Sequence, residues 1–302
     1  MSALKKSIYQ WISKQFMDGC SSYNSLEVRK SCRSKEQARA VFAAGEIPHA
    51  QGLIFINPFK AISFAKQHGF PLVIKPNVSG FSRGSHFPIR NFKQLWKAIF
   101  LAKFWWPATV VEQYLEGNNY RVVAAQGEIM SVLQRYSPFV EGNGTDTIDS
   151  LIDQENAIRE EMNLYPCIHP LQKGSVTQTY LKKQNLNLSS VPATGEIIKL
   201  FYRISLAPGG VVRTIDKDTI PVVNQDLFKN VLGLFDANIL GIDVIMEKGI
   251  ETDFRDQKVI FLEVNSRPYL KMHDYPRYGK KEDLSAYFES LDQLDITQTD
   301  LF

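Results

Sequence analysis

Apolar positions in the first part of the chain recur at two spacings, which predict helices alternating with short strands. Leu4, Ile8 and Phe16 lie at helical spacing, and Ser34 with Gln37 resembles the capping box that begins a helix. Gly45 then ends that helix. The elements predicted here are helices over 3–17, 34–44, 59–68 and 91–104 and strands over 71–74 and 109–115.

The second part of the chain has consecutive strands instead. Residues 120–126 and 128–135 alternate around Gln126-Gly127, which predicts a hairpin. Residues 136–195 show little regular pattern apart from a helix over 148–162. The elements predicted beyond them are strands over 196–204, 211–215, 240–245 and 259–265 and helices over 224–237 and 281–291.

This arrangement predicts an α+β protein with two lobes that meet near residues 115–117. The expected domains are an N-terminal helical extension (1–33), an N-terminal lobe (34–115) and a C-terminal lobe (116–302) with a long middle insertion (136–195).

Composition describes an ordinary globular protein. Of 302 residues, 44% are apolar and 22% charged, and 35 basic against 32 acidic residues give a net charge of +3. This balance favours neither nucleic acid nor a membrane as partner. Cys20, Cys32 and Cys167 have no metal-site spacing, and the N-terminus lacks a signal-peptide core. We therefore expect three reduced thiols in a cytoplasmic protein.

Three side chains on two late strands could supply oxygen ligands to a metal ion. In 259–265 the apolar run ends in Glu263-Val264-Asn265, and residues two apart in a strand share a face. Asp243 lies in the preceding strand. Two carboxylates and an amide oxygen suit Mg²⁺ better than zinc, although acids at strand ends are more often simply solvated.

Three earlier segments could bind a nucleotide. Lys75 at a strand exit precedes a glycine- and serine-rich loop, whose backbone N–H groups could bind phosphate; the alternative is a plain hairpin loop. The strand 109–115 runs into Gly117 and could offer main-chain groups to a purine, or be an ordinary strand exit. The third is Lys35 at a helix start, where a lysine is usually just a solvated helix residue.

The order of these pieces resembles that of ATP-grasp enzymes. At closer range the chain is similar to the ATP-grasp module of cyanophycin synthetases and of bifunctional glutamate–cysteine ligase/glutathione synthetases. The similar blocks are EGNNYRVVAAQGEIMSVLQRYSPFVEGNGTDTIDSLIDQEN, VPATGEIIKL, GGVVRTIDKDTIP and GIDVIM…FLEVNSRPYLKMHDYPRYGK, within about residues 34–281. The resemblance implies an ATP-grasp fold, ATP and Mg²⁺ as cofactors, and an ATP-dependent carboxylate–amine ligase.

The resemblance also implies roles for individual residues. Lys35 and Lys75 would contact the phosphates, and the loop 79–85 would close over them. Asn119 stands where an acid would contact the ribose. The full expected set is, for the nucleotide, Lys35, Lys75, Ser79, Gly80, Ser82, Arg83, Gly84, Glu112, Gln113, Leu115 and Asn119, and for Mg²⁺, Asp243, Glu263 and Asn265.

The mechanism adds two arginines. In such a ligase the substrate carboxylate forms an acyl phosphate, which an amine then attacks. The oxyanion that results needs a cation, for which Arg203 and Arg267 are candidates. An ordinary surface or ion-pair role is the alternative for each.

The chain departs from the family pattern on the acceptor side. Phe201 stands where an arginine is expected, with Arg203 two residues on, and Thr214 and Lys217 replace two expected acids. The segment 205–210 replaces the expected N-x-S-T-G-G. Because of these changes, the sequence does not identify which amino acids or peptides are the substrates. Two alternative functions also remain: a nucleotide-binding regulatory module that no longer ligates, and a kinase that stops at phosphoryl transfer.

About 33 residues precede the ATP-grasp blocks, and no second enzymatic half follows them. We therefore expect a stand-alone ligase of small-molecule acids and amines. A homodimer is among the partners considered.

Overall fold

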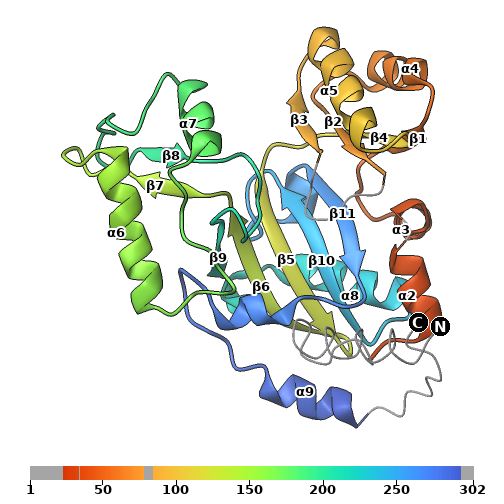
Figure 1. Ribbon diagram of the computed structural model, residues 1–302. Coiled ribbons are helices and arrows are strands. Elements are labelled where there is room, and N and C mark those ends of the chain that lie inside the picture. Colours follow the sequence, from red (N-terminus) through yellow and green to blue (C-terminus); the bar gives the residue numbers. More distant parts are fainter. Residues whose placement is uncertain (1–22, 34, 78–83, 294–302) are drawn as a thin grey trace, which may run out of the picture.

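The computed structural model describes residues 23–33, 35–77 and 84–293. Two separate antiparallel sheets organise the chain (Figure 1). The small sheet has the order β1-β4-β2-β3, from β1 (Gly52–Phe55), β2 (Leu72–Pro76), β3 (His86–Ile89) and β4 (Thr109–Gln113). Helices α4 (Pro58–His68) and α5 (Phe92–Trp105) pack on it, so the small lobe has its own apolar core.

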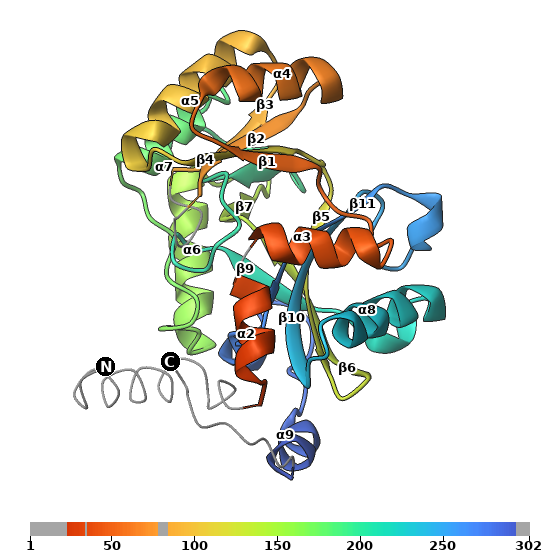
Figure 2. The same cartoon turned by 90° about the vertical axis from the view of Figure 1, so that its right-hand side faces the viewer.

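The large sheet has the order β11-β10-β5-β6-β9. Its strands are β5 (Asn118–Ala125), β6 (Glu128–Tyr136), β9 (Val211–Thr214), β10 (Ile239–Met246) and β11 (Val259–Asn265). Helices α3 (Lys35–Ala44) and α8 (Val222–Leu234) share a core with one face of this sheet, and α2 (Leu26–Arg33) lies against β11 (Figure 2). The helix that follows residue 34 therefore packs on the large sheet.

A third group of elements forms an arm beside the large sheet, at the left of Figure 1. It consists of β7 (Phe139–Glu141) paired with β8 (Ile197–Lys199), α6 (Ile148–Glu161) and α7 (Ser175–Lys182), around a separate apolar cluster. The remaining elements are α9 (Ser285–Asp292) and the 3₁₀ turns η2 (Lys217–Thr219), η3 (Phe254–Asp256) and η4 (Leu270–Asp274).

Local sequence explains where several helices begin. Asn57 and Asn91 accept backbone N–H bonds of 3.0 and 2.9 Å at the starts of α4 and α5, and Thr147 accepts one of 3.2 Å at the start of α6. Such caps satisfy N–H groups that a helix leaves unpaired at its first turn.

The predicted α+β class is confirmed, and the structure corrects some element predictions. The strand expected over 196–204 covers only 197–199, because the chain turns away after Leu200. The patterns did not indicate α2, β1, β3, β7 or α7, all of which are eight residues or fewer. The helix predicted over 3–17 lies outside the described residues. Within the described ranges no helix is long and apolar enough to cross a membrane.

Candidate functional site

A cavity of about 240 Å³ lies where the two sheets approach each other near α2 and α3. Glu112 of the small sheet lines it, and so do Glu263 and Asn265 of the large sheet. The other lining residues are Cys32, Ala38, Arg39, Phe42, Ala50, Phe261, Leu262 and Val264. The cavity thus brings together predicted residues that lie about 150 positions apart in the sequence.

Glu112 is the charged centre of the small-sheet side. It is 7% exposed, and Lys75 Nζ on the neighbouring strand donates to its Oε2. Arg39 Nη1 of α3 donates to Oε1 at 2.8 Å. A carboxylate between two cations is well compensated for its burial, and the arrangement ties the small sheet to α3.

Asp243 is held between two arginines on the large sheet. Arg121 lies directly opposite it on β5 and donates through Nε to Oδ1 and through Nη2 to Oδ2, the latter at 3.1 Å. Arg135 Nη2 lies 3.1 Å from Oδ2, and its Nε donates to Asn119 Oδ1 at 2.6 Å. Burial alone would raise the pKa of Asp243, but the two guanidinium charges outweigh it and lower the pKa below its usual value.

Glu263 and Asn265 lie beside this ion pair on β11. Glu263 is the cross-strand partner of Asp243, and Asn265 that of Gly241, so their side chains share the face of Asp243. Asn265 Nδ2 is buried and has no hydrogen-bond partner among the described residues. The N–H donors of this amide are therefore unused there.

This donor set fits Mg²⁺ in part. Glu263 and Asn265 supply the oxygen types that Mg²⁺ prefers, whereas both oxygens of Asp243 are engaged by arginine. Among the described residues no three His, Cys, Asp or Glu side chains form a metal-binding group, and the predicted set holds only two carboxylates. Arg121 and Arg135 occupy three of the roughly four lone-pair positions of Asp243, which leaves about one for a metal ion.

Sequence reasoning missed three residues of this site: Arg39, Arg121 and Arg135. A signal was present for Arg121, because it is a single charge inside the apolar strand 120–125, and a charge buried in a strand needs a partner. Nothing comparable marks Arg39, whose role depends on how α3 packs against the small sheet.

The other predicted nucleotide residues surround the cavity or lie outside the described part. Gln113 Oε1 accepts from the backbone N of Gln51 at 3.2 Å, and Leu115 lies half-buried in the connection between the sheets. Gly84 has φ +71°, where a Cβ would meet Pro76 at 2.9 Å. Ser79, Gly80, Ser82 and Arg83 lie outside the described residues, and only the backbone of Lys35 is described, at the start of α3.

Arg203 lies on a group of aromatic rings between the arm and the small sheet. Its Nε donates to Tyr202 Oη at 3.0 Å, and its guanidinium lies 5.6 Å from the Phe201 ring centre. The Tyr202 ring is 5.5 Å from Phe87 of β3. Burial lowers the pKa of His86, and the charge of Arg203 lowers it further. Arg203 therefore contacts Phe201, the residue that replaces the expected arginine.

Arg267 is half-buried in the segment that follows β11, and burial lowers the pKa of its guanidinium. It does not line the cavity. The structure thus places the two candidate arginines in different surroundings.

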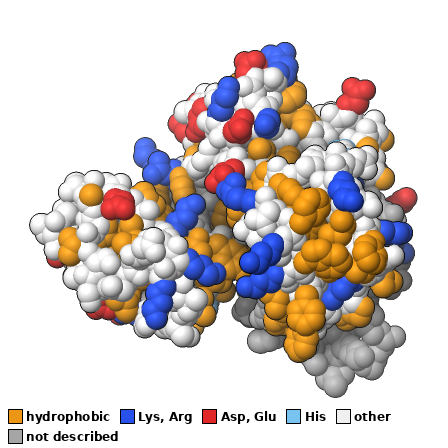
Figure 3. Space-filling view, turned by 90° about the horizontal axis from the view of Figure 1, so that it is seen from above, with side chains coloured by type: hydrophobic (Ala, Val, Ile, Leu, Met, Phe, Trp, Pro, Cys, Tyr) orange, Lys and Arg blue, Asp and Glu red, His pale blue; other side chains and the backbone are white. Residues whose placement is uncertain are grey.

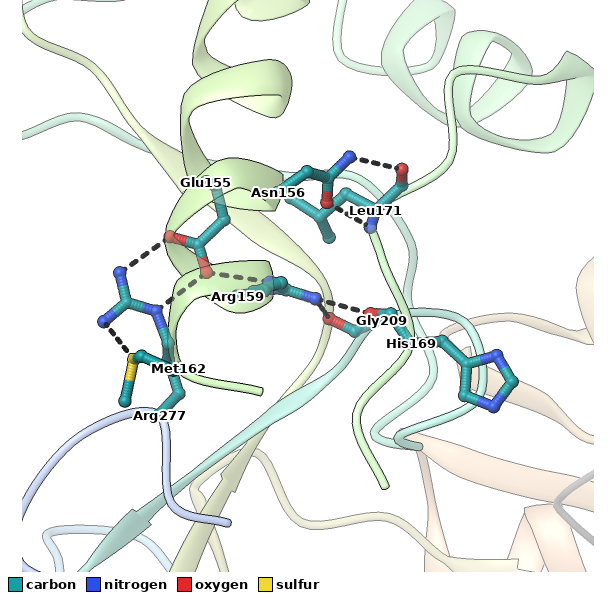
Figure 4. Close-up of polar contacts among 8 residues, drawn as sticks. All are labelled: Glu155, Asn156, Arg159, Met162, His169, Leu171, Gly209 and Arg277. Atoms are coloured by element: carbon teal, nitrogen blue, oxygen red, sulfur yellow. Dashed lines mark hydrogen bonds and ion pairs between the residues drawn. The ribbon is translucent and has the colours of Figure 1, made fainter. Parts of the chain in front are cut away.

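An ion-pair network fixes the glycine pair Gly209-Gly210 (Figure 4). Arg159 Nη1 of α6 donates to the carbonyls of His169 and Gly209 at 2.8 and 2.9 Å. Glu155 accepts from Arg159 at 2.8 Å and from Arg277 at 3.0 and 2.8 Å. Burial raises the pKa of Glu155, but the arginines outweigh it and lower the pKa overall. The arm thereby holds the loop 205–210 in place.

Known proteins resemble this chain in sequence and in fold. A cyanophycin synthetase from Synechocystis sp. is 31% identical over 269 residues, which cover 86% of this chain and 30% of that protein. The chain thus spans about a third of the length of this curated relative. No family model matches the chain.

Two solved structures share the fold. A bifunctional glutathione synthetase from Pasteurella multocida superposes with a TM-score of 0.65 at 21% identity, over 90% of this chain and 38% of that one. The ATP-grasp ligase PsnB, complexed with a minimal precursor, superposes with a TM-score of 0.51 at 12% identity, over 89% and 64%. The resemblance found in the sequence is confirmed.

Proposed function

We propose that this chain, which has the ATP-grasp fold and is related to cyanophycin synthetases, is an ATP-dependent carboxylate–amine ligase. The proposed cofactors are ATP and Mg²⁺, and the proposed substrates are small amino acids or peptides. The observation that carries the proposal is the cavity between the sheets, which combines Glu112, Glu263 and Asn265. Lys75 and Arg39 add positive charge at its edge.

The charges around this cavity suit a polyphosphate with bound metal. Mg²⁺, when bound, would neutralise phosphate charge, and Glu263 and Asn265 are the residues that would hold it. Lys75 and Arg39 share the single carboxylate of Glu112, so the three side chains together keep one net positive charge for a phosphate. An anion is therefore favoured beside Glu112 despite its own charge.

The proposed reaction has two steps. A carboxylate oxygen of the first substrate attacks the γ-phosphorus of ATP, ADP leaves, and an acyl phosphate forms. The amine of the second substrate then attacks the acyl carbon, phosphate leaves, and the amine loses a proton to solvent. Arg203 is proposed to stabilise the oxyanion of this second step, because its guanidinium lies beside Phe201 where the related enzymes are expected to carry arginine.

The free thiols of Cys32 and Cys167 support a reducing compartment, so we propose the cytoplasm as the site of the reaction. Burial raises the pKa of each thiol to about 11, which makes both unreactive. A homodimer stays a prediction.

One observation favours a second candidate, a nucleotide-binding module that does not ligate. Both oxygens of Asp243 already accept from Arg121 or Arg135, so this expected metal ligand is neutralised within the protein. A module of this kind would bind ATP without forming an acyl phosphate.

Trapping with hydroxylamine separates the two candidates. Hydroxylamine converts an acyl phosphate into a hydroxamate and needs no knowledge of the natural amine. The ligase hypothesis predicts hydroxamate from at least one pool of amino acids or short peptides with ATP and Mg²⁺, and none with Glu263→Ala. ATP binding without hydroxamate in any pool would favour the regulatory module.

A further inference from the structure

The outer face of α5 carries an aromatic row that the core does not use. Phe92, Trp96, Phe100 and Phe104 recur at intervals of four residues, which places them along one side of the helix. The opposite side buries Leu95, Ala98, Ile99 and Ala102 in the small lobe. The helix is therefore already packed on one side, and the aromatic row faces outward.

These side chains are exposed to an unusual degree. Phe100 is 74% exposed and Phe104 88% exposed. Phe59 of α4 lies against Trp96 with ring centres 6.0 Å apart, and Trp105 is also exposed, so the row widens into an aromatic face (Phe59, Phe92, Trp96, Phe100, Phe104 and Trp105). Figure 3, which views the molecule from above, shows a group of exposed hydrophobic side chains in orange. A contiguous exposed apolar patch usually marks an interaction site.

The small lobe around this face is strongly basic. Residues 47–113 contain eight of the chain's basic residues and only one of its 32 acidic ones, the buried Glu112, so the rest of the chain is net negative. The eight are Lys60, Lys66, Lys75, Arg83, Arg90, Lys93, Lys97 and Lys103. Lys93 and Lys97 are exposed on α5, and within the described residues neither forms an ion pair.

We propose that the aromatic face and its lysines bind an anionic membrane surface. Phe and Trp along one side of a helix, with Lys beside them, are typical of helices that lie in the interface of a bilayer. Trp places its apolar ring and its N–H at the headgroup level, and Lys attracts anionic lipid. The protein would thus bind the membrane peripherally, without a membrane-spanning helix.

The charge distribution argues for lipid over a second copy of the chain. A symmetric dimer through this face would bring two basic lobes together, and like charges would oppose it. The uneven charge distribution also explains why the net charge of +3 did not indicate a membrane partner. That value is the sum of a basic small lobe and an acidic remainder.

Vesicle co-sedimentation tests the proposal on the full chain. Vesicles of phosphatidylcholine with about a third phosphatidylglycerol should pellet the protein at about 50 mM NaCl, and about 0.5 M NaCl should release it. Phe100→Glu with Phe104→Glu should weaken binding about a hundredfold, because both rings leave the bilayer interface. The matched control is Val222→Glu, a 71% exposed residue at the start of α8, which should bind like the natural chain.

A second variant covers the case in which the double Glu substitution alters folding, to be checked by circular dichroism. Lys93→Gln with Lys97→Gln should weaken binding to the anionic vesicles about thirtyfold. A natural chain that stays in the supernatant at low salt would overturn the proposal. Variants that bind the vesicles as well as the natural chain would overturn it too. The same holds if the aromatic face mediates only self-association or only binding of a single-stranded DNA oligonucleotide.

Discussion

At the residue scale, the neighbouring carboxylates of Asp243 and Glu263 differ in their surroundings. Asp243 is 5% exposed between Arg121 and Arg135, while Glu263 directly across the strands is half-buried beside the cavity. Both were predicted as metal ligands, Glu263 at the tip of its strand and Asp243 as the one inward acid of the strand before it. The distinction could not be predicted, because it depends on which side chains the cross-strand register places beside Asp243.

Neutralising Asp243 should therefore affect stability more than neutralising Glu263. Asp243→Asn leaves two buried guanidinium groups without their counter-charge, which costs about 3–5 kcal/mol in the free energy of unfolding. Glu263→Gln should cost less than about 1 kcal/mol, because the residue is partly solvated. Urea unfolding of both variants measures this. Equal losses would mean that Asp243 and Glu263 form one site with the same role.

A buried histidine makes stability depend on pH. His273 is 1% exposed, its Nδ1 lies 2.7 Å from Ser131 Oγ, and burial, followed by the charge of Arg121, lowers its pKa to about 3. The unfolded chain binds a proton near pH 6.5 and the folded chain does not. The free energy of unfolding should therefore fall as pH drops from about 6.5 toward 3, by up to about 1.4 kcal/mol per pH unit.

The matched variant is His273→Asn, which keeps a polar atom near Ser131 but does not titrate in this range. Its unfolding free energy should change less steeply with pH than that of the natural chain. Burial raises the pKa of the nearby Glu282, which opposes the slope, so the difference between the two proteins is the quantity to measure. Identical slopes would show that His273 is protonated in the folded chain.

At the element scale, the long periodic segments of the described chain were predicted correctly, whereas several short ones were missed. The helices α5 and α8 and the hairpin β5–β6 lie close to their predicted ranges. The four-residue strands β1 and β3 each bury only one residue and so show little apolar pattern, and pairing with β4 and β2 forms them. The helix α7 contains Val176 and two threonines, which favour strands, and tertiary packing overrides that preference.

The arm shows how one element positions another. Arg159 of α6 bonds the carbonyls of His169 and Gly209, so Arg159→Met should loosen the loop 205–210 and leave Glu155 with one partner fewer. We expect a loss of about 3 kcal/mol in unfolding free energy and at least tenfold slower turnover, with nucleotide affinity unchanged.

Lys173→Met is the control on the same arm. Lys173 pairs with Asp149 and Asp153 of α6 at an exposed position, so its loss should cost less than about 1 kcal/mol. Unfolding curves and steady-state rates of the two variants provide the comparison. Normal turnover in Arg159→Met would show that the loop has no part in the reaction.

At the scale of the whole molecule, two sheets contribute opposite sides of one cavity. The sequence resemblance predicted this two-lobed fold, because the motifs occur in the same order along most of the chain. It did not predict that α3 packs on the large sheet and reaches Glu112 through Arg39. Nor did it predict the uneven charge of the two lobes, which depends on local rather than total composition.

We propose that the cavity between the sheets joins a carboxylate to an amine at the expense of ATP. The most direct measurement is ADP release with Mg²⁺ against pooled acids and amines, with either substrate omitted in turn and Glu263→Ala as control. We predict release that needs both substrates and that disappears in the variant. ADP release that needs no amine, or that persists in Glu263→Ala, would show that this cavity is not the site of a ligase reaction.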